Sequence, residues 1–117
     1  MQTRTFVAVL AVLGLLASCA QLDPHPMDMT QAVRSAKTSA DHEALAKHYE
    51  DTAKRMQTKA QQQKKMLEEY ETHGYYYGRK TDDLKEHTQA LMRLYEQAAE
   101  ANMNMAASHR KMATDAK

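Results

Sequence analysis

Histidine and methionine residues near the two ends of the chain could together bind a metal ion. Met105, His109 and Met112 follow one another at spacings of four and three residues, so an α-helix would place them on one face. If that helix packs antiparallel against an earlier one, His42 comes to lie near His109 and Met112. Thioether and imidazole groups are the ligands that suit Cu(I). Two interpretations follow: copper binding by these four side chains, or methionines that simply fill gaps between packed helices.

Three consecutive tyrosines are the second candidate for a functional site. Tyr75, Tyr76 and Tyr77 occupy a glycine-flanked segment, residues 74–78, between two long helical patterns. Aromatic rings at an exposed turn could contact a partner protein or stack on a sugar ring, because such rings are strong binding anchors. Alternatively, one or two of them fold back to cover neighbouring side chains such as Tyr70.

No comparable set of residues indicates catalysis. The chain has no HExxH motif, no glycine-rich phosphate loop and no plausible Ser-His-Asp set, and it lacks the CxxCH motif of haem attachment. Its 16 Lys and Arg residues nearly balance 15 Asp and Glu residues. A basic patch for nucleic acid is therefore not indicated. We expect a protein without enzymatic activity.

The N-terminus has the layout of a secretory signal. Arg4 precedes an apolar run, residues 6–17, of roughly 12 residues, which is shorter than the approximately 20 that a membrane-spanning helix needs. The run closes with Leu16-Ala17-Ser18-Cys19. This motif resembles the lipobox of bacterial lipoproteins. In that family the cysteine sulfur receives a diacylglyceryl group, a peptidase cuts before the cysteine, and the new amine is acylated.

The resemblance implies that residues 1–18 are a signal peptide and that Cys19 is the lipidation site. The alternative is an ordinary cleaved signal with an incidental cysteine. Residue 20 is Ala and not the Asp that retains enterobacterial lipoproteins in the inner membrane. The resemblance thus implies anchoring in the outer membrane with the domain in the periplasm. Three acyl chains would give stable attachment, since one alone binds only marginally.

The mature chain is expected to be all-α. Three glycines, two prolines, one Phe and no Trp leave little material for a sheet, whereas good helix formers are abundant. Both prolines lie within residues 19–37, which we expect to form a flexible tether with at most a short helical turn. Residues 38–117 then form the domain. We expect one helix over 39–73 with Ser39 as its cap, a turn over 74–80 with Gly74 left-handed, and a second helix over 81–113 with Thr81 as its cap.

Apolar residues at alternating spacings of three and four predict a coiled-coil-like seam on each helix. On the first helix the seam is Ala46, Tyr49, Ala53, Met56, Ala60, Gln63, Leu67 and Tyr70. On the second it is Leu84, His87, Leu91, Leu94, Ala98, Ala101, Met105, Ser108 and Met112. Folding the chain about residue 77 pairs positions whose numbers add to about 154. This gives a long antiparallel two-helix hairpin.

The second helix carries another apolar stripe beside its seam: Met92, Tyr95, Ala99, Met103 and Ala106. A face that wide is expected of a helix with more than one neighbour, so we expect two hairpins to pair into a four-helix bundle. An envelope protein or peptidoglycan is another expected partner. A lipobox, a heptad helix and the terminal Lys117 together resemble the murein lipoprotein, in which such a lysine is joined to peptidoglycan. The preceding residues 113–116 differ from that protein's aromatic-basic tail.

The leading interpretation is a lipid-anchored protein of the cell envelope with a structural or protein-interaction role. The alternative is a periplasmic copper-binding lipoprotein that uses the Met/His cluster. In an antiparallel hairpin this cluster would lie near the tether, and the tyrosines would lie at the far tip.

Overall fold

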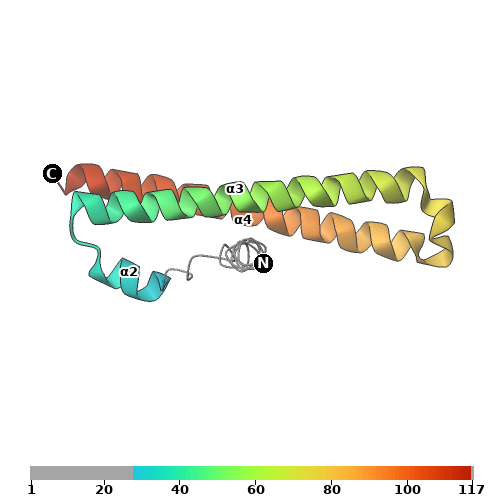
Figure 1. Ribbon diagram of the computed structural model, residues 1–117, viewed down its shortest axis with the longest axis horizontal. Helices are drawn as coiled ribbons and strands as arrows, with labels where there is room; N and C mark the ends of the chain where they lie inside the picture. Colours follow the sequence, from blue (N-terminus) through green and yellow to red (C-terminus); the bar gives the residue numbers. More distant parts are fainter. Residues whose placement is uncertain (1–27, 117) are drawn as a thin grey trace, which may run out of the picture. The chain divides into compact units, whose positions relative to one another are not determined.

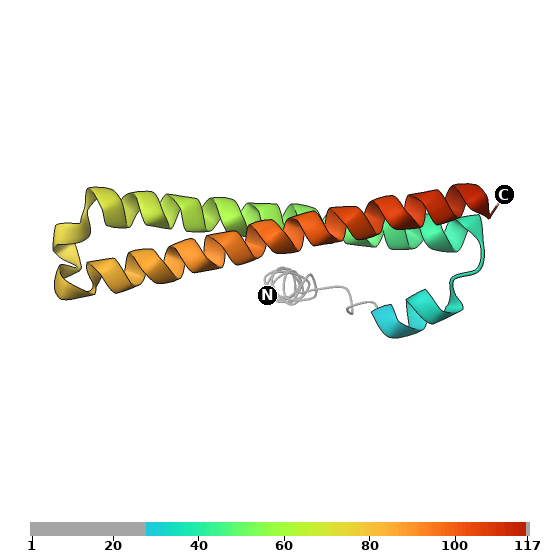
Figure 2. The same cartoon turned by 180° about the vertical axis from the view of Figure 1, so that it is seen from behind.

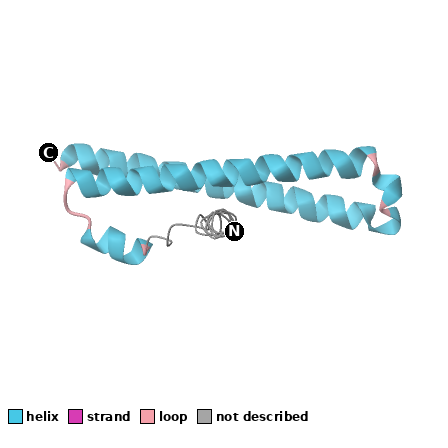
Figure 3. Ribbon diagram, viewed as in Figure 1, coloured by secondary structure: helices cyan, strands magenta, loops and turns pink. Residues whose placement is uncertain are grey.

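The computed structural model describes residues 28–116. The lipobox, Cys19 and Lys117 lie outside these described residues. The regular structure of the described part is helical: α2 (Met29–Ser35), α3 (Ser39–Thr72) and α4 (Thr81–Asp115), with the short 3₁₀ helices η2 (Gly74–Tyr76) and η3 (Gly78–Lys80) between α3 and α4 (Figure 3). Helices α3 and α4 run antiparallel, side by side (Figures 1 and 2). The predicted all-α, antiparallel two-helix hairpin is confirmed.

Helix α3 begins with a reciprocal capping box. The N–H of Asp41 donates to Oγ1 of Thr38 (3.1 Å), and the N–H of Thr38 donates to a carboxylate oxygen of Asp41 (2.9 Å). The N–H groups of Lys37 and Thr38 donate to the Asp41 carboxylate and lower its pKa to about 2. The cap is therefore Thr38 and not Ser39, because only Thr38 has an acidic residue three positions later.

The turn is held by the hydroxyl of Thr81. Its oxygen lies 2.6 Å from the carbonyl oxygen of Gly74 and 2.8 Å from that of Gly78, so its one hydrogen is shared between the two acceptors. Thr81 therefore closes the turn and does not cap α4. A side chain at Gly74 would place a Cβ 2.7 Å from Cγ2 of Thr81, which explains the glycine there. The left-handed residue is Gly78, at φ 59°, and not Gly74 as the sequence suggested.

Alanines dominate the interface between the two long helices. Ala46, Ala53 and Ala60 recur every seventh residue on α3, and Ala99, Ala106 and Ala113 do so on α4. All six are at most 5% exposed. Without bulky side chains, the two backbones can approach closely. The contacts of Glu50 with Arg110 and of Tyr49 with His109 match a register in which opposing residue numbers add to about 159. This register places each alanine of one helix opposite an alanine of the other.

The predicted seam of α3 agrees with the burial of its residues, but that of α4 is wrong. The residues of α4 that face α3 are Thr88, Met92, Tyr95, Ala99, Asn102, Ala106, His109 and Ala113, all buried or half-buried. Leu91, Leu94, Met105 and Met112 of the predicted seam are instead 41%, 59%, 42% and 47% exposed. The predicted seam of α4 follows the large apolar residues of the helix. In the structure, the alanine faces of the two helices form the contact. The true register is consequently displaced by about five residues from the predicted one.

One further difference concerns the predicted tether. Residues 29–35 form the helix α2, which has no buried residue. The carboxylate of Asp28 accepts from the N–H of Gln31 at 3.2 Å, so Asp28 caps this short helix. No helix within residues 28–116 is long and apolar enough to cross a membrane.

Candidate functional site

Three aromatic rings stack at the end of the hairpin farthest from the turn. The ring of His109, on α4, lies between the rings of His42 and Tyr49 on α3. Its centroid is 5.4 Å from that of His42 and 5.5 Å from that of Tyr49, and it is nearly parallel to the tyrosine ring, with an interplanar angle of 8°. His42 and Tyr49 are seven residues apart and therefore lie on the same face of α3. Helix α3 therefore contacts the His109 ring through two side chains, one on either side.

The two histidines also form a direct hydrogen bond. Nδ1 of His42 and Nδ1 of His109 are 3.1 Å apart, so one ring donates its Nδ1–H and the other accepts it. His42 is half-buried and His109 is only 5% exposed. Burial, together with the nearby charge that His42 can carry, lowers the pKa of His109. At neutral pH the buried imidazole is consequently held in its neutral form, in which its ring nitrogen can bind a metal.

The predicted methionine ligands occupy the surface beside this stack. Met105 and Met112 are 42% and 47% exposed, on the side of α4 that adjoins the buried His109. The structure thus brings His42 and His109 into contact, whereas the side chains of Met105 and Met112 are exposed to solvent. Within the described range, no group of three or more His, Cys, Asp or Glu side chains gathers to hold a metal ion.

Tyr49 is the residue of this cluster that the sequence analysis did not single out. It belongs to the predicted seam of α3 and follows His42 by one heptad. That spacing indicates that Tyr49 and His42 lie on the same face of α3, toward α4. His48 contacts the edge of the Tyr49 ring, with centroids 5.9 Å apart and an interplanar angle of 77°. The ion pair between Glu50 and Arg110, at 2.6 Å, joins the two helices one residue further along each.

The three tyrosines at the turn differ in how far their side chains are exposed. Tyr75 and Tyr76 are 71% and 72% exposed, and their ring centroids are 4.1 Å apart. Tyr77 is 38% exposed and packs edge-on against Tyr70, with centroids 5.0 Å apart. Only the first two therefore present open aromatic surface at the turn, while Tyr77 contacts the hairpin.

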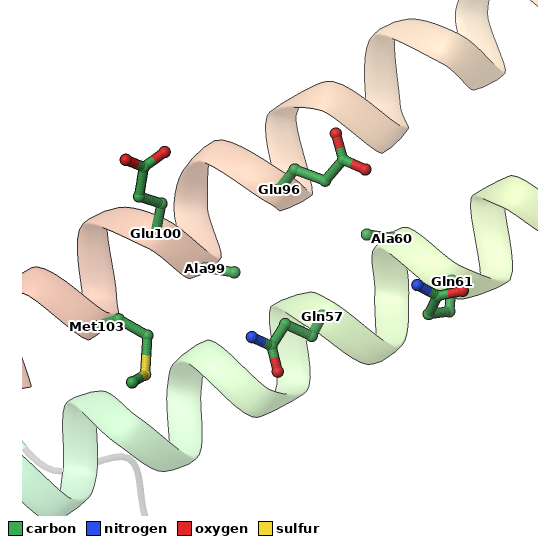
Figure 4. Close-up of a pocket in the computed structure, with 7 residues that line it drawn as sticks. All are labelled: Gln57, Ala60, Gln61, Glu96, Ala99, Glu100 and Met103. Atoms are coloured by element: carbon green, nitrogen blue, oxygen red, sulfur yellow. The ribbon is translucent and has the colours of Figure 1, made fainter.

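A shallow groove of about 270 Å³ lies between the middle parts of the two helices. It is lined by Gln57, Ala60, Gln61, Glu96, Ala99, Glu100 and Met103. Figure 4 shows the side chains of Ala60 and Ala99 projecting into the space between the two helices, with the carboxylate of Glu100 directed away from α3. The groove is open to solvent, and its floor is formed by the two alanines.

An uncharged stripe runs along another side of α4. It comprises Leu84, His87, Leu91, Leu94, Ala98, Ala101, Met105, Ser108 and Met112. These positions repeat every 3.5 residues, which is the coiled-coil period, and none of them carries a carboxylate, ammonium or guanidinium group. The charged residues of α4 between Lys85 and Lys111 occupy other faces of the helix. The hairpin thus has a coiled-coil seam that its own packing does not use.

Comparisons with known proteins identify no relative of this chain, so its function is inferred from the features described above. No family model, no curated protein and no solved structure matches the chain. The class defined by the fold is an antiparallel helical hairpin with an alanine interface.

Proposed function

We propose that this chain is a lipid-anchored protein of the bacterial cell envelope whose helical hairpin has a structural, protein-binding role and no enzymatic activity. The anchor is Cys19, whose sulfur is lipidated before residues 1–18 are removed and whose amine is acylated afterwards, and the membrane is the outer membrane. The lipobox sequence supports the anchor. The observation that carries the protein-binding role is the exposed heptad stripe on α4, because large apolar side chains repeat there at the period of a helix–helix interface.

The partner that best fits this stripe is a second copy of the same chain. An antiparallel pair of α4 helices, related by a two-fold axis between Ala98 and Ala101, places Leu94 of each copy opposite Met105 of the other. Ala98 then lies opposite Ala101 at the centre, Leu91 lies opposite Ser108, and His87 lies opposite Met112. No pair of like charges lies in this contact, because the stripe is uncharged over roughly 43 Å of helix. The result is a four-helix bundle.

The lipid anchor is tested by expressing the full chain in a Gram-negative host with a radioactive fatty acid. The wild-type chain should incorporate the label and sediment with the outer membrane. Inhibiting the lipoprotein signal peptidase should make the longer, unprocessed form accumulate. Cys19→Ala is the control, since it removes the only cysteine of the chain. An unlabelled wild-type chain that is released into the periplasmic fraction would refute the anchor.

The dimer is tested in the same cells with a single introduced thiol. Lipidation consumes Cys19, so Ala98→Cys provides the one reactive sulfur of the mature chain. A short bis-maleimide reagent should link two copies of this variant. Ala107→Cys, on an exposed face turned about 180° away from Ala98, is the matched control and should stay monomeric. Adding Leu94→Glu should abolish the link by placing two carboxylates in the contact. Equal linking through both cysteines would count against the stripe.

A further inference from the structure

We infer that the imidazoles of His42 and His109 and the thioether of Met112 form a binding site for one Cu(I) ion. This inference goes beyond the proposed function, because it needs only one chain and no lipid. Its failure would leave both the anchor and the dimer standing.

The two imidazoles already lie at nearly the right separation. Two nitrogen ligands at metal distances of about 2.0 Å, with angles between tetrahedral and trigonal, are about 3.3 to 3.5 Å apart. The Nδ1 atoms of His42 and His109 are 3.1 Å apart. Opening the pair by a few tenths of an ångström would admit an ion in place of the shared hydrogen. The ring that donates this hydrogen carries none on Nε2 while it is neutral. As its Nδ1 proton leaves to solvent, Nε2 takes up a proton from solvent, so both rings bind the ion as neutral imidazoles through Nδ1.

The stacked ring of Tyr49 keeps one of these ligands in place. Its nearly parallel contact with His109, at 5.5 Å and 8°, restricts rotation of the imidazole plane. His109 is only 5% exposed, so α3 and α4 together determine its position. His42 is half-buried and can adjust to an incoming ion. One rigid and one adjustable imidazole make a site that opens with little disturbance of the hairpin.

Helix geometry selects Met112 over Met105 as the third ligand. Side chains on a helix lean toward its N-terminus and cover the preceding turn. Met112, three residues after His109, therefore reaches back toward the imidazole. Met105, four residues before His109, leans away from it. In a single chain Met112 is 47% exposed, so its thioether is not held by packing within the hairpin. Two imidazoles and one thioether are a ligand set that favours Cu(I) over harder ions.

The test is a titration of the full-length chain in detergent with Cu(I) and a chromophoric Cu(I) chelator, without oxygen. The wild-type chain should withdraw one Cu(I) per chain from the chelator. His42→Ala should weaken binding by more than the roughly 10- to 100-fold that loss of a supporting group costs. Met112→Leu should weaken it about tenfold, while Met105→Leu, its matched control on the same face, should bind like the wild type.

X-ray absorption at the copper edge provides a second measurement that does not depend on affinity. The spectrum should contain two nitrogen ligands and one sulfur, and Met112→Leu should lose the sulfur. His109 is buried, so His109→Ala is interpreted only alongside its circular dichroism. A wild-type chain that leaves all Cu(I) with the chelator would overturn the site. Equal behaviour of Met112→Leu and Met105→Leu, or equal binding of Zn(II), would overturn the thioether ligand.

Discussion

Replacing Ala106 by Leu tests which face of α4 forms the hairpin interface. Ala106 is 0% exposed and, in the register of the structure, lies opposite Ala53, which is also 0% exposed. Leucine adds three carbon atoms where the helices touch, and such overpacking costs about 1 to 3 kcal/mol. The intrinsic helix propensities of Leu and Ala differ little, so the cost reports on packing.

The matched control is Ala107→Leu, at the next position of the same helix. Ala107 is exposed, and a surface substitution of this kind should change the free energy of unfolding by no more than about 0.5 kcal/mol. For a domain of this size, 2 kcal/mol corresponds to a fall in Tm of roughly 8 to 16 °C. Thermal and urea unfolding followed by circular dichroism at 222 nm measures both variants. If Ala106→Leu and Ala107→Leu have the same Tm, the alanine interface is refuted.

Three further predictions concern the helix ends and an ion pair, each measured by the same unfolding experiments. Thr38→Ala should cost about 1 kcal/mol by removing the cap of α3, whereas Ser39→Ala should have almost no effect; the reverse order would place the cap at Ser39. Gly78→Ala should cost about 1 to 2 kcal/mol, because φ at this position is 59°, and an unchanged stability would contradict the left-handed turn. Glu50→Gln should cost less than about 1 kcal/mol at low salt, since the pair with Arg110 is partly exposed, and nothing in 1 M salt; a salt-independent loss would show that packing is involved.

The helix boundaries could be predicted because local residues set them. Thr38 and Ser39 mark the start of α3 and Gly74 marks its end, and the observed bounds of α3 and α4 lie within two residues of the predicted ones. The capping residue of α3 depends on the spacing between a hydroxyl side chain and a following acidic residue, which distinguishes Thr38 from Ser39. Thr38 is followed three positions later by Asp41, and this completes the capping box.

The contact face of α4 could not be predicted from its large residues. Leu91, Leu94, Met105 and Met112 form a clear heptad pattern, yet they are exposed. The interface instead uses Met92, Tyr95, Ala99 and Ala106 of the second apolar stripe, which the sequence analysis assigned to a neighbouring hairpin. Thr88 and Asn102, which an apolar pattern does not reveal, complete it. Which of the two stripes of α4 packs against α3 depends on how closely the two helix backbones approach each other. That distance is a property of the helix pair and cannot be read from one helix alone. The six alanines at seven-residue spacing were the signal that would have given the register.

The candidate site was predicted in part. His42 and His109 were expected near each other, and the structure brings their Nδ1 atoms to 3.1 Å. The predicted register is wrong by about five residues, yet the two histidines still meet. The reason is that His109 lies between His42 and Tyr49, which are one heptad apart on α3. The stack with Tyr49 was missed, since it depends on ring orientation. Sequence spacing gives the face of a helix but not the direction of a ring.

The position of the histidine pair also has a kinetic consequence. His42 and His109 are 67 positions apart in the chain, whereas Thr81 and Gly74 at the turn are only seven apart. Short loops close at lower entropic cost, so pairing of the helices should start at the turn and proceed toward the histidines, which meet last. Contacts that form after the rate-limiting step slow unfolding and leave the folding rate almost unchanged. A ligand bridging the two histidines would therefore act as a latch on the open end, lengthening the lifetime of the hairpin without hastening its formation.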